Sequence, residues 1–530
     1  MLLTDPHKNR RVSETKPITY LVTALCLALS ACRVGPKYHV PPATAQAPPA
    51  TYKESPQNYP DSDWKIAQPD DAMLRGKWWE IFNDPELNGL EDQLNINNQN
   101  IKQFFQNFME ARAIVREARS QLWPTFGVAP SFTRSRSSAN LTNETGIGSS
   151  GGTGTGSSGT NTTTAAGRQS TIESLPFELS WEPDLWGKVR NTISSDQYAA
   201  QMSAAELENE RLTEQASLAE FFFELRGQDA LQKILDDTVE ADKKALEVTE
   251  NAYKTGVDDE ISVVQAQNTL QNAEAAATNI GVARAQFEHA IAMLIGKAAS
   301  NFSLPVRPVT VIAPPIPIGV PSQLLERRPD IAAAERTMAS ANAQIGVATA
   351  AFYPDLTLTA EGGTESSTLK HLFDWPSRFW SIGGTASETI FDAGLRRATV
   401  DQFVATYNAD VASYRQTVIV AFQQVEDELA ATRILAHQIN QQQAAVNSAT
   451  RYVELETNRY KMGIDPYVDV VTAQTTLLTD QETFATLHVQ QMTAAVELIE
   501  ALGGGWDKSQ LPTPAQVSQK PDKAATAIQQ

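Results

Sequence analysis

The chain has 530 residues, of which 42% are apolar and 20% are charged, a composition typical of globular proteins that argues against disorder throughout. The formal net charge is −19, and because phosphate binding needs clustered Lys and Arg side chains, this charge argues against a nucleic-acid partner. Both cysteines, Cys26 and Cys32, lie close to the N-terminus, so the sequence offers neither a disulfide framework nor a cysteine metal cluster.

The first 31 residues have the pattern of a lipoprotein signal peptide. A basic segment that contains Arg10 and Arg11 precedes an apolar run from Ile18 to Leu29, which leads into Cys32. The run has about 12 to 14 residues, whereas a helix that crosses a bilayer needs about 20 apolar residues, so a membrane-spanning anchor is disfavoured. We predict cleavage before Cys32 and acylation of its thiol; an ordinary signal peptide with an incidental cysteine is the alternative.

An internal repeat organises the remaining chain. The segment Tyr-Lys-Thr-Gly-Val-Asp at 253–258 recurs as Tyr-Lys-Met-Gly-Ile-Asp at 460–465, which is 207 positions later. Upstream the offset is 230, from Pro124 to Pro354, and one long loop in the Gly-, Ser- and Thr-rich tract at 140–164 explains the difference. The predicted segments are a signal peptide (1–31), a lipid-anchored N-terminal periplasmic segment (32–85), repeat 1 (86–303), a proline-rich linker (304–321), repeat 2 (322–503) and a flexible C-terminal tail (504–530).

Long helices are expected in both repeats. The segments from Gly187 to Tyr253 and from Gly394 to Tyr460 contain no proline, and Gly227 is their only internal glycine. Each is therefore predicted to be one helix of about 66 residues, or ~100 Å at 1.5 Å per residue. Their apolar residues recur at spacings of three and four, as in coiled coils. Shorter helices are expected at 87–122, 261–295, 322–352 and 468–502.

Four segments change to strand periodicity, with apolar and polar residues alternating at 126–133, 174–182, 355–361 and 380–391. Each has about 10 residues, the length of a tilted strand that crosses a bilayer. Four strands leave two open edges, and unpaired backbone groups in hydrocarbon cost several kcal/mol each, so copies of the chain must close the sheet. Two copies would give eight strands and a filled lumen, whereas three would give twelve and room for a passage; the sequence alone leaves both open.

Several motifs resemble those of one known family. They are Cys-Arg-Val-Gly-Pro-Lys-Tyr at 32–38, Trp-Trp-Glu-Ile-Phe-Asn-Asp-Pro at 78–85, Leu-Leu-Glu-Arg-Arg-Pro-Asp-Ile at 324–331, Ala-Glu at 334–335, Ile-Gly at 345–346 and Phe-Tyr-Pro at 352–354. With these motifs the chain resembles the TolC-type outer-membrane factors, specifically the lipoprotein branch that serves resistance-nodulation-division pumps. The resemblance implies an α+β membrane protein: a trimeric α/β-barrel channel with long coiled-coil-like helices and four transmembrane strands per protomer, twelve in the trimer.

The same resemblance implies the function. The chain would be the passive outer-membrane channel of a tripartite efflux pump, a homotrimer that receives substrates from a periplasmic adaptor and an inner-membrane resistance-nodulation-division transporter. Arg33 follows Cys32 where inner-membrane lipoproteins carry Asp, which implies a lipid-anchored protein in the outer membrane of a Gram-negative bacterium. No cofactor is expected apart from the diacylglycerol and N-acyl chain on Cys32. The alternatives are an exit duct for type I protein secretion and a periplasmic scaffold lipoprotein, which would lack paired strands.

In this family the periplasmic end narrows where the helix pairs turn, which corresponds here to 253–264 and 460–471. The candidate pore and gate residues in these turns are Asp258, Asp259, Asp465, Val468 and Asp469. Threefold symmetry would convert each inward-facing carboxylate into a ring of three that attracts cations. We expect Val468 and Asp469 to form the gate, although an acid often present three residues later is Thr472 here. For Asp258 and Asp259, stabilisation of the helix dipole is an equal explanation.

Lys254, Lys461 and Gly463 are candidate adaptor contacts, with ordinary turn chemistry as the alternative. A GxGxxG match at 154–159 lies in the low-complexity tract without a strand-to-helix crossover, so it does not predict nucleotide binding. The six histidines show no metal-ligand spacing, and no nucleophile motif accompanies them, so neither a metal site nor enzymatic activity is predicted.

Overall fold

The computed structural model describes residues 33–44, 51–54, 76–136, 169–308, 313–314, 316 and 324–520. The predicted signal peptide, Cys32 and the tract at 140–164 lie outside these residues. The chain divides into two units. The sheet unit contains Glu117–Ile193, Gln344–Gln402 and the residues up to Pro36, and the helical unit contains Lys37–Arg116, Ser194–Ala343 and Phe403–Gln530.

The order and lengths of the helices confirm the internal repeat. Three helices of repeat 1 have partners of identical length in repeat 2: α3 (Gln99–Ser120) and α7 (Pro329–Ala350) have 22 residues, α4 (Lys188–Lys254) and α8 (Leu395–Lys461) have 67, and α5 (Glu260–Leu294) and α9 (Tyr467–Ala501) have 35. The start of α8 follows that of α4 by the 207 positions read from the sequence, and the predicted long helices are confirmed.

Two of the shorter helices are interrupted where the sequence suggested continuity. The segment predicted as one helix from 87 to 122 forms α2 (Pro85–Asn97) and α3, because Asn98 leaves the helical conformation (ψ 131°) and its side-chain oxygen accepts the Ile101 N–H at 3.0 Å. The segment predicted from 322 begins with the short α6 (Leu324–Arg327), and α7 starts at Pro329. A residue that precedes proline disfavours the helical conformation, which accounts for this second break.

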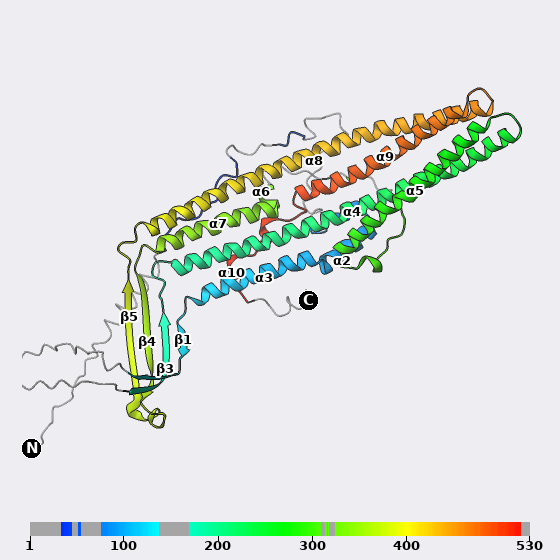
Figure 1. Cartoon of the computed structure of the whole chain (residues 1–530). Helices are drawn as coiled ribbons and strands as arrows, with labels where there is room; N and C mark the ends of the chain where they lie inside the picture. The colour runs from blue at the N-terminus through cyan, green and yellow to red at the C-terminus, as the bar shows by residue number, and fades with distance from the viewer. Residues whose placement is uncertain are drawn as a thin grey trace, which may run out of the picture. The chain divides into compact units, whose positions relative to one another are not determined.

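The sheet is antiparallel, with the strand order β1-β3-β4-β5, and β2 also pairs with β3 (Figure 1). Its strands are β1 (Thr125–Val128), β2 (Ser131–Arg136), β3 (Gln169–Trp181), β4 (Asp355–Ser366) and β5 (Arg378–Ser387). Val128 pairs with Phe177 and Ser131 with Ser174, so β1 and β2 keep one register and form a single strand interrupted at Pro130. The four predicted strands are thus confirmed, except that β5 ends four residues before Phe391.

The register separates apolar from polar residues on the two faces of the sheet. Paired residues share a face, and one face carries the row Phe126, Leu179, Ala360 and Ile382 and the row Val128, Phe177, Gly362 and Trp380. The row between them, on the opposite face, contains Gly127, Glu178, Glu361 and Ser381. The apolar face is uncovered in the single chain, with Phe126 69% exposed and Trp380 and Ile382 each 78% exposed. An exposed apolar surface of this kind indicates contact with lipid or with another protein surface.

Close backbone packing explains one pair of motif glycines. Gly35 has φ of +117°, and a β-carbon on it would lie 2.5 Å from the α-carbon of Gly346. A β-carbon on Gly346 would in turn lie 2.6 Å from the side-chain nitrogen of Asn191. Glycine is required at 35, because a side chain there would force the two backbones apart, whereas a side chain at 346 would displace the amide of Asn191. The segment after Cys32 and the Ile-Gly motif of α7 therefore pack directly against each other in the sheet unit.

The helical unit has its main core around the Trp-Trp motif, which forms the 3-10 helix η2 (Trp78–Phe82). Trp78 is fully buried and donates a hydrogen bond of 3.1 Å from its indole nitrogen to Gln215, and Phe82 packs against Phe223 with ring centroids 5.0 Å apart. Further along, α8 buries one stripe at spacings of three and four, consisting of Tyr414, Val418, Ala421, Val425 and Leu429. The predicted amphipathic pattern is confirmed there.

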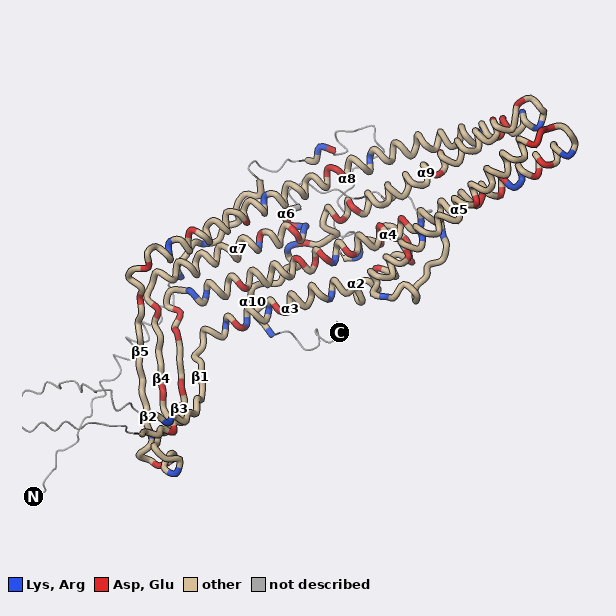
Figure 2. Tube along the Cα trace, viewed as in Figure 1, with Lys and Arg blue, Asp and Glu red and all other residues tan. Residues whose placement is uncertain are grey.

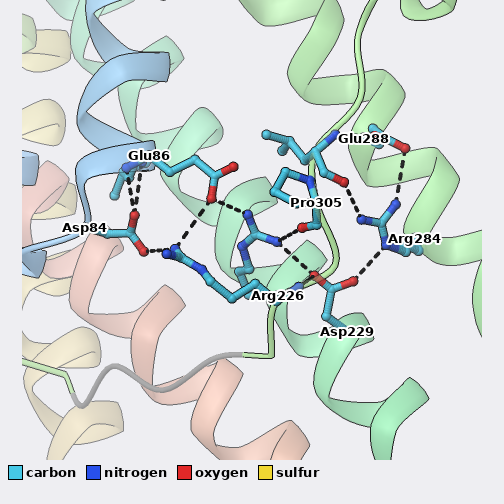
Figure 3. A network of polar contacts seen from close by, with 10 residues as sticks. Asp84, Glu86, Arg226, Asp229, Arg284, Glu288 and Pro305 are labelled. Atoms are coloured by element: carbon cyan, nitrogen blue, oxygen red, sulfur yellow. Dashed lines mark hydrogen bonds and ion pairs between the residues drawn. The ribbon is translucent and has the colours of Figure 1, made fainter. Parts of the chain in front are cut away.

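A buried ion network joins α2, α4 and α5 to the first residues of the inter-repeat linker (Figure 3). Arg226 of α4 donates hydrogen bonds to Asp229 at 2.8 Å, to Glu86 at 2.5 Å and to the carbonyl of Pro305 at 2.7 Å. Asp229 also accepts from Arg284 of α5 at 2.7 Å. The side chain of Asp229 is fully buried, so its charge depends on these two guanidinium groups.

The first part of the predicted flexible tail is packed. Residues 508–510 form a 3-10 helix and α10 covers Pro514–Val517, while Trp506 and Val517 are buried and Arg112 donates to the carbonyl of Gln519 at 2.8 Å. Residues 504–520 therefore differ from the expected loose tail, and 521–530 lie outside the described residues. In the described part of the chain, every helix is too short or too polar to cross a bilayer.

Candidate functional site: the turns of the two helix hairpins

The helical unit contains two hairpins, α4 with α5 and α8 with α9, whose turns hold the pore candidates (Figure 1). Both turns end their first helix in the same way. The amide of Gly256 donates to the carbonyl of Tyr253 at 3.0 Å, and that of Val257 donates to Ala252 at 2.9 Å. Gly463 and Ile464 repeat these bonds 207 positions later. Gly256 and Gly463 have φ of +72° and +68°, the left-handed conformation that this helix ending requires.

Asp258 and Asp259 have different roles in the first turn. The side chain of Asp259 accepts from the amide of Ser262 at 3.2 Å and thereby caps α5, which fits the helix-start explanation. Asp258 accepts three hydrogen bonds: from the Asp259 amide at 2.8 Å, from the Ser262 hydroxyl at 2.9 Å and from the Tyr460 phenol at 2.7 Å. Partial burial raises the pKa of Asp258, but these hydrogen bonds outweigh it, so its pKa lies below the ordinary value.

The hydrogen bond between Asp258 and Tyr460 is a link between the hairpins. Tyr460 lies at the end of α8, and its ring meets that of Tyr467, the first residue of α9, edge to face with centroids 5.3 Å apart. Tyr467 is buried in an apolar cluster with Ala266 of α5 and Val470 of α9. The turn regions of the two repeats are therefore held together by one polar contact and one small apolar cluster.

The second turn combines charges of both signs (Figure 2). Arg459 pairs with Asp465, with a second hydrogen bond of 3.0 Å between them, and this contact lowers the pKa of Asp465. Val468 and Asp469 occupy the first turn of α9, where Val468 is exposed and Asp469 half-buried. The predicted gate pair thus lies beside Asp465. Thr472, which stands where a further acid was expected, donates to the carbonyl of Val468 at 2.9 Å.

Asp242 is a buried carboxylate that the sequence analysis did not single out. Its side chain in α4 is only 2% exposed, and neither oxygen has a hydrogen-bond partner among the described residues. Burial raises the pKa of Asp242 to about 6, and the charge of Asp242 contributes, after burial, to raising the pKa of Tyr467 to about 12. The signal was present in the sequence, because Asp242 follows Val239, a buried residue of the same helix, at a spacing of three.

The predicted adaptor contacts lie at the tips of the hairpins. Lys254 is exposed and pairs with Glu250 at 3.3 Å, and Lys461 and Gly463 are also exposed. Apolar tip residues accompany them, among which Val257 is 78% exposed and its equivalent Ile464 is 58% exposed. The structure therefore brings the sequence candidates of each turn together. The sequence did not predict Tyr460 or Arg459 as their partners, because these contacts depend on how the helices pack.

Comparison with known proteins connects this architecture to outer-membrane channels. A sequence model of the family described as "Outer membrane efflux protein" matches residues 90–297 and 320–504. The chain is 31% identical to "Probable efflux pump outer membrane protein SepC" of Pseudomonas putida, over 92% of this chain and 97% of that protein. It is 29% identical to "Outer membrane protein OprJ" of Pseudomonas aeruginosa, over 92% of this chain and 96% of that protein.

Solved structures have the same fold. The outer-membrane channel OprN superposes with a TM-score of 0.79 at 24% identity, over 90% of this chain and 100% of that chain. The open state of the MtrE outer membrane channel of Neisseria gonorrhoeae gives a TM-score of 0.74 at 22% identity, over 90% of this chain and 99% of that chain.

Proposed function

The chain belongs to the outer membrane efflux protein family, as its motifs indicated, and we propose that three copies form the passive outer-membrane duct of an efflux pump. The observation that supports this proposal comes from the sheet unit. Its apolar face is exposed, and among the described strands β5 and the interrupted strand β1/β2 each pair on one side only. Open edges cannot remain unpaired in hydrocarbon, so copies of the chain must pair edge to edge. Three copies supply twelve strands, enough to leave a passage.

We assign the periplasmic end of the duct to the hairpin turns. Long antiparallel helix pairs from three copies would form the tunnel wall, and the turns would form its entrance. Val468 is exposed at the start of α9 and Asp469 lies next to it, so a threefold axis beside them would produce an apolar ring and a carboxylate ring. Asp258 and Asp465 are committed to Tyr460 and Arg459, which assigns them to holding the turns rather than lining the passage.

The partners follow from the same arrangement. The exposed tip residues, including Lys254, Lys461 and Gly463, would contact a periplasmic adaptor, and an inner-membrane transporter of the resistance-nodulation-division class would supply the energy. Acyl chains on Cys32 would anchor the chain in the outer membrane after removal of residues 1–31. The remaining segment boundaries proposed from the sequence are the N-terminal segment to 85, repeat 1 to 303, the linker to 321 and repeat 2 to 503. Relatives named as efflux pump proteins favour this function over a type I secretion duct.

The proposal is tested with full-length protein extracted from outer membranes in detergent. We expect a trimer by mass measurement that dissociates on heating, and small cation-selective currents when it is inserted into planar bilayers. A monomer without conductance would contradict the proposal and would favour a scaffold role. Conducting oligomers of another size would reject the threefold arrangement.

A further inference from the structure

Three arginines lie on the apolar face of the sheet, all at one end. Arg134 and Arg136 belong to β2 and pair with Thr171 and Gln169, and Arg378 is the first residue of β5 and pairs with Thr364. Because Leu175 pairs with Thr364, and paired residues share a face, Arg378 stands on the same face as Leu175 and Phe177. Alternation along β2 places Arg134 and Arg136 on that face as well. All three arginines are exposed.

The charges of the described strands are separated between the two faces. The acids Glu178, Glu361 and Glu365 are on the face opposite the arginines, as the pairs Glu178 with Glu361 and Ser174 with Glu365 establish. On the arginine face the described strands carry one acid, Glu173, which is half-buried and opposite Phe132. Cations therefore outnumber anions at this end of the apolar face, whereas its middle rows carry no charge.

At this end of the sheet the chain passes from one strand to the next without entering the long helices. Residues 137–168 connect β2 to β3, and residues 367–377 connect β4 to β5, whereas the other strand ends continue into the helices α3, α4, α7 and α8. If the helices extend into the periplasm, as the proposed function requires, the arginine end lies at the outer surface of the membrane. The apolar rows then lie in hydrocarbon and the arginines at the level of the lipid headgroups.

The connection between β4 and β5 adds aromatic side chains at the same level. The ring of Trp375 stacks on the guanidinium of Arg378, whose central carbon lies 3.9 Å from the ring centroid. Phe373 and Trp375 are exposed, and Trp380 follows Arg378 on the apolar face. Aromatic side chains next to cations are typical of the border between hydrocarbon and headgroups, where the ring lies in an apolar layer and the charge meets phosphate.

We propose that Arg134, Arg136 and Arg378 bind the phosphate groups of an acidic glycolipid of the outer leaflet, the phosphorylated lipid A part of lipopolysaccharide, whose acyl chains cover the apolar rows. A guanidinium matches phosphate with two parallel hydrogen bonds, and the apolar rows match acyl chains. The inference rests on the proposed function, because it requires the sheet to cross the outer membrane. Antiparallel pairing of the β5 edge of one copy with the β1/β2 edge of the next would also bring the two strand ends that carry these arginines to the same side of each junction.

The experiment measures lipid binding to the full-length protein, purified and delipidated in an uncharged detergent. Diphosphorylated lipid A is titrated and the bound fraction is measured by native mass spectrometry. We expect the variant Arg134→Gln/Arg136→Gln/Arg378→Gln to bind at least about tenfold more weakly than the wild type, since charge-assisted hydrogen bonds are the strong ones. The matched control, Arg119→Gln/Arg397→Gln/Arg451→Gln, removes the same charge from exposed helix positions and should bind like the wild type.

Two further ligands identify the source of the phosphate. Dephosphorylated lipid A should bind wild type and variant equally weakly, and millimolar inorganic phosphate should leave bound lipid A in place. Equal binding of lipid A by the wild type and the three-arginine variant would overturn the inference, and so would displacement by inorganic phosphate, which indicates a site for free anions. A second variant, Arg134→Lys/Arg136→Lys/Arg378→Lys, keeps the charge without the planar fork and should bind with intermediate strength.

Conductance in phosphatidylcholine bilayers, recorded on the same preparations, separates this inference from the proposed function. We expect the three-arginine variant to conduct like the wild type, because the substituted side chains lie on the lipid face. Unchanged lipid binding with normal conductance would reject the lipid site and leave the duct intact. Absence of conductance in the wild type itself would reject the proposed duct.

Discussion

The phenol of Tyr460 donates a hydrogen bond of 2.7 Å to the carboxylate of Asp258, which joins the end of α8 to the turn before α5. The two residues are 202 positions apart in the chain. Tyr253, which occupies the position of Tyr460 in the first repeat, is half exposed and has no such contact among the described side chains. The two turns therefore share a backbone conformation but differ in this hydrogen bond. Tyr460, and not Tyr253, is placed to restrain the hairpins.

The substitution Tyr460→Phe should loosen the two hairpins. It removes the donor and leaves the ring, so the contact with Tyr467 is retained, and a hydrogen bond to a charged group contributes about 1.5 to 3 kcal/mol. We expect a larger mean conductance in planar bilayers at neutral pH. The control is Tyr253→Phe, which should conduct like the wild type; equal conductance of all three proteins would show that the link does not restrain the passage.

The same link predicts an effect of acid. The pKa of Asp258 is lowered in the folded protein, so the stability that it contributes is present above the ordinary pKa of Asp and is lost as the pH falls through the lowered value. Wild-type conductance should approach that of Tyr460→Phe as the pH is lowered in that range. A constant difference between the two proteins at every pH would contradict the assignment.

Val468→Ala with Asp469→Ala tests the proposed gate. Smaller side chains at an apolar ring and a carboxylate ring should widen the constriction and raise single-channel conductance, and Asp469→Asn alone should lower selectivity for cations over anions. Ile261→Ala is the matched control, because Ile261 is the first-repeat equivalent of Val468 and is likewise exposed. Unchanged conductance in the double variant would place the constriction elsewhere.

Asp242→Asn tests the buried carboxylate near Tyr467. Because burial raises the pKa of Asp242 to about 6, the folded protein binds a proton that the unfolded chain has already released, and stability falls as the pH rises from about 4 to 6. The ionised form costs up to about 3 kcal/mol, since one pKa unit corresponds to about 1.4 kcal/mol. Melting temperature measured across this range should fall in the wild type and change less in Asp242→Asn. Asp236→Asn, at an exposed position of α4, should retain the wild-type slope.

Arg226→Met should destabilise the helical unit. The substitution leaves the fully buried Asp229 with Arg284 as its remaining cationic partner, and breaking a buried pair by removing one side costs about 3 to 5 kcal/mol. The free energy of unfolding measured in urea should fall by about this amount. Lys233→Met is the control, because its ion pair with Asp237 is exposed on both sides and such pairs contribute less than about 1 kcal/mol. Similar losses of unfolding free energy in the two variants would show that the buried network stabilises the fold no more than the exposed ion pair does.

Much of the fold followed from local patterns. The absence of proline from 188–254 and 395–461, with Gly227 as their single glycine, predicted the long helices, and alternation predicted the strands, because these signals depend on backbone propensities and on the two side-chain periods. Gly256 and Gly463, the glycines of the repeated turn sequence, both have positive φ, so this local repeat also corresponds to a repeated backbone conformation. The break at Asn98 was missed, since its side chain must both cap α3 and donate to Glu214 at 2.9 Å, a partner far away in sequence.

The features of the candidate site also divide into those that the sequence predicts and those that depend on tertiary structure. Amino-acid order alone determined which residues stand at the turns, because a helix ending and a turn are set by a few neighbouring residues. It also determined that each repeat has two long helices and two strands. Tertiary structure alone decided that Asp258 meets Tyr460, that the Asp242 carboxylate has no hydrogen-bond partner among the described residues and that three arginines share one face of the sheet. These depend on helix packing and strand register, and a shift of one residue in register would move every strand side chain to the opposite face.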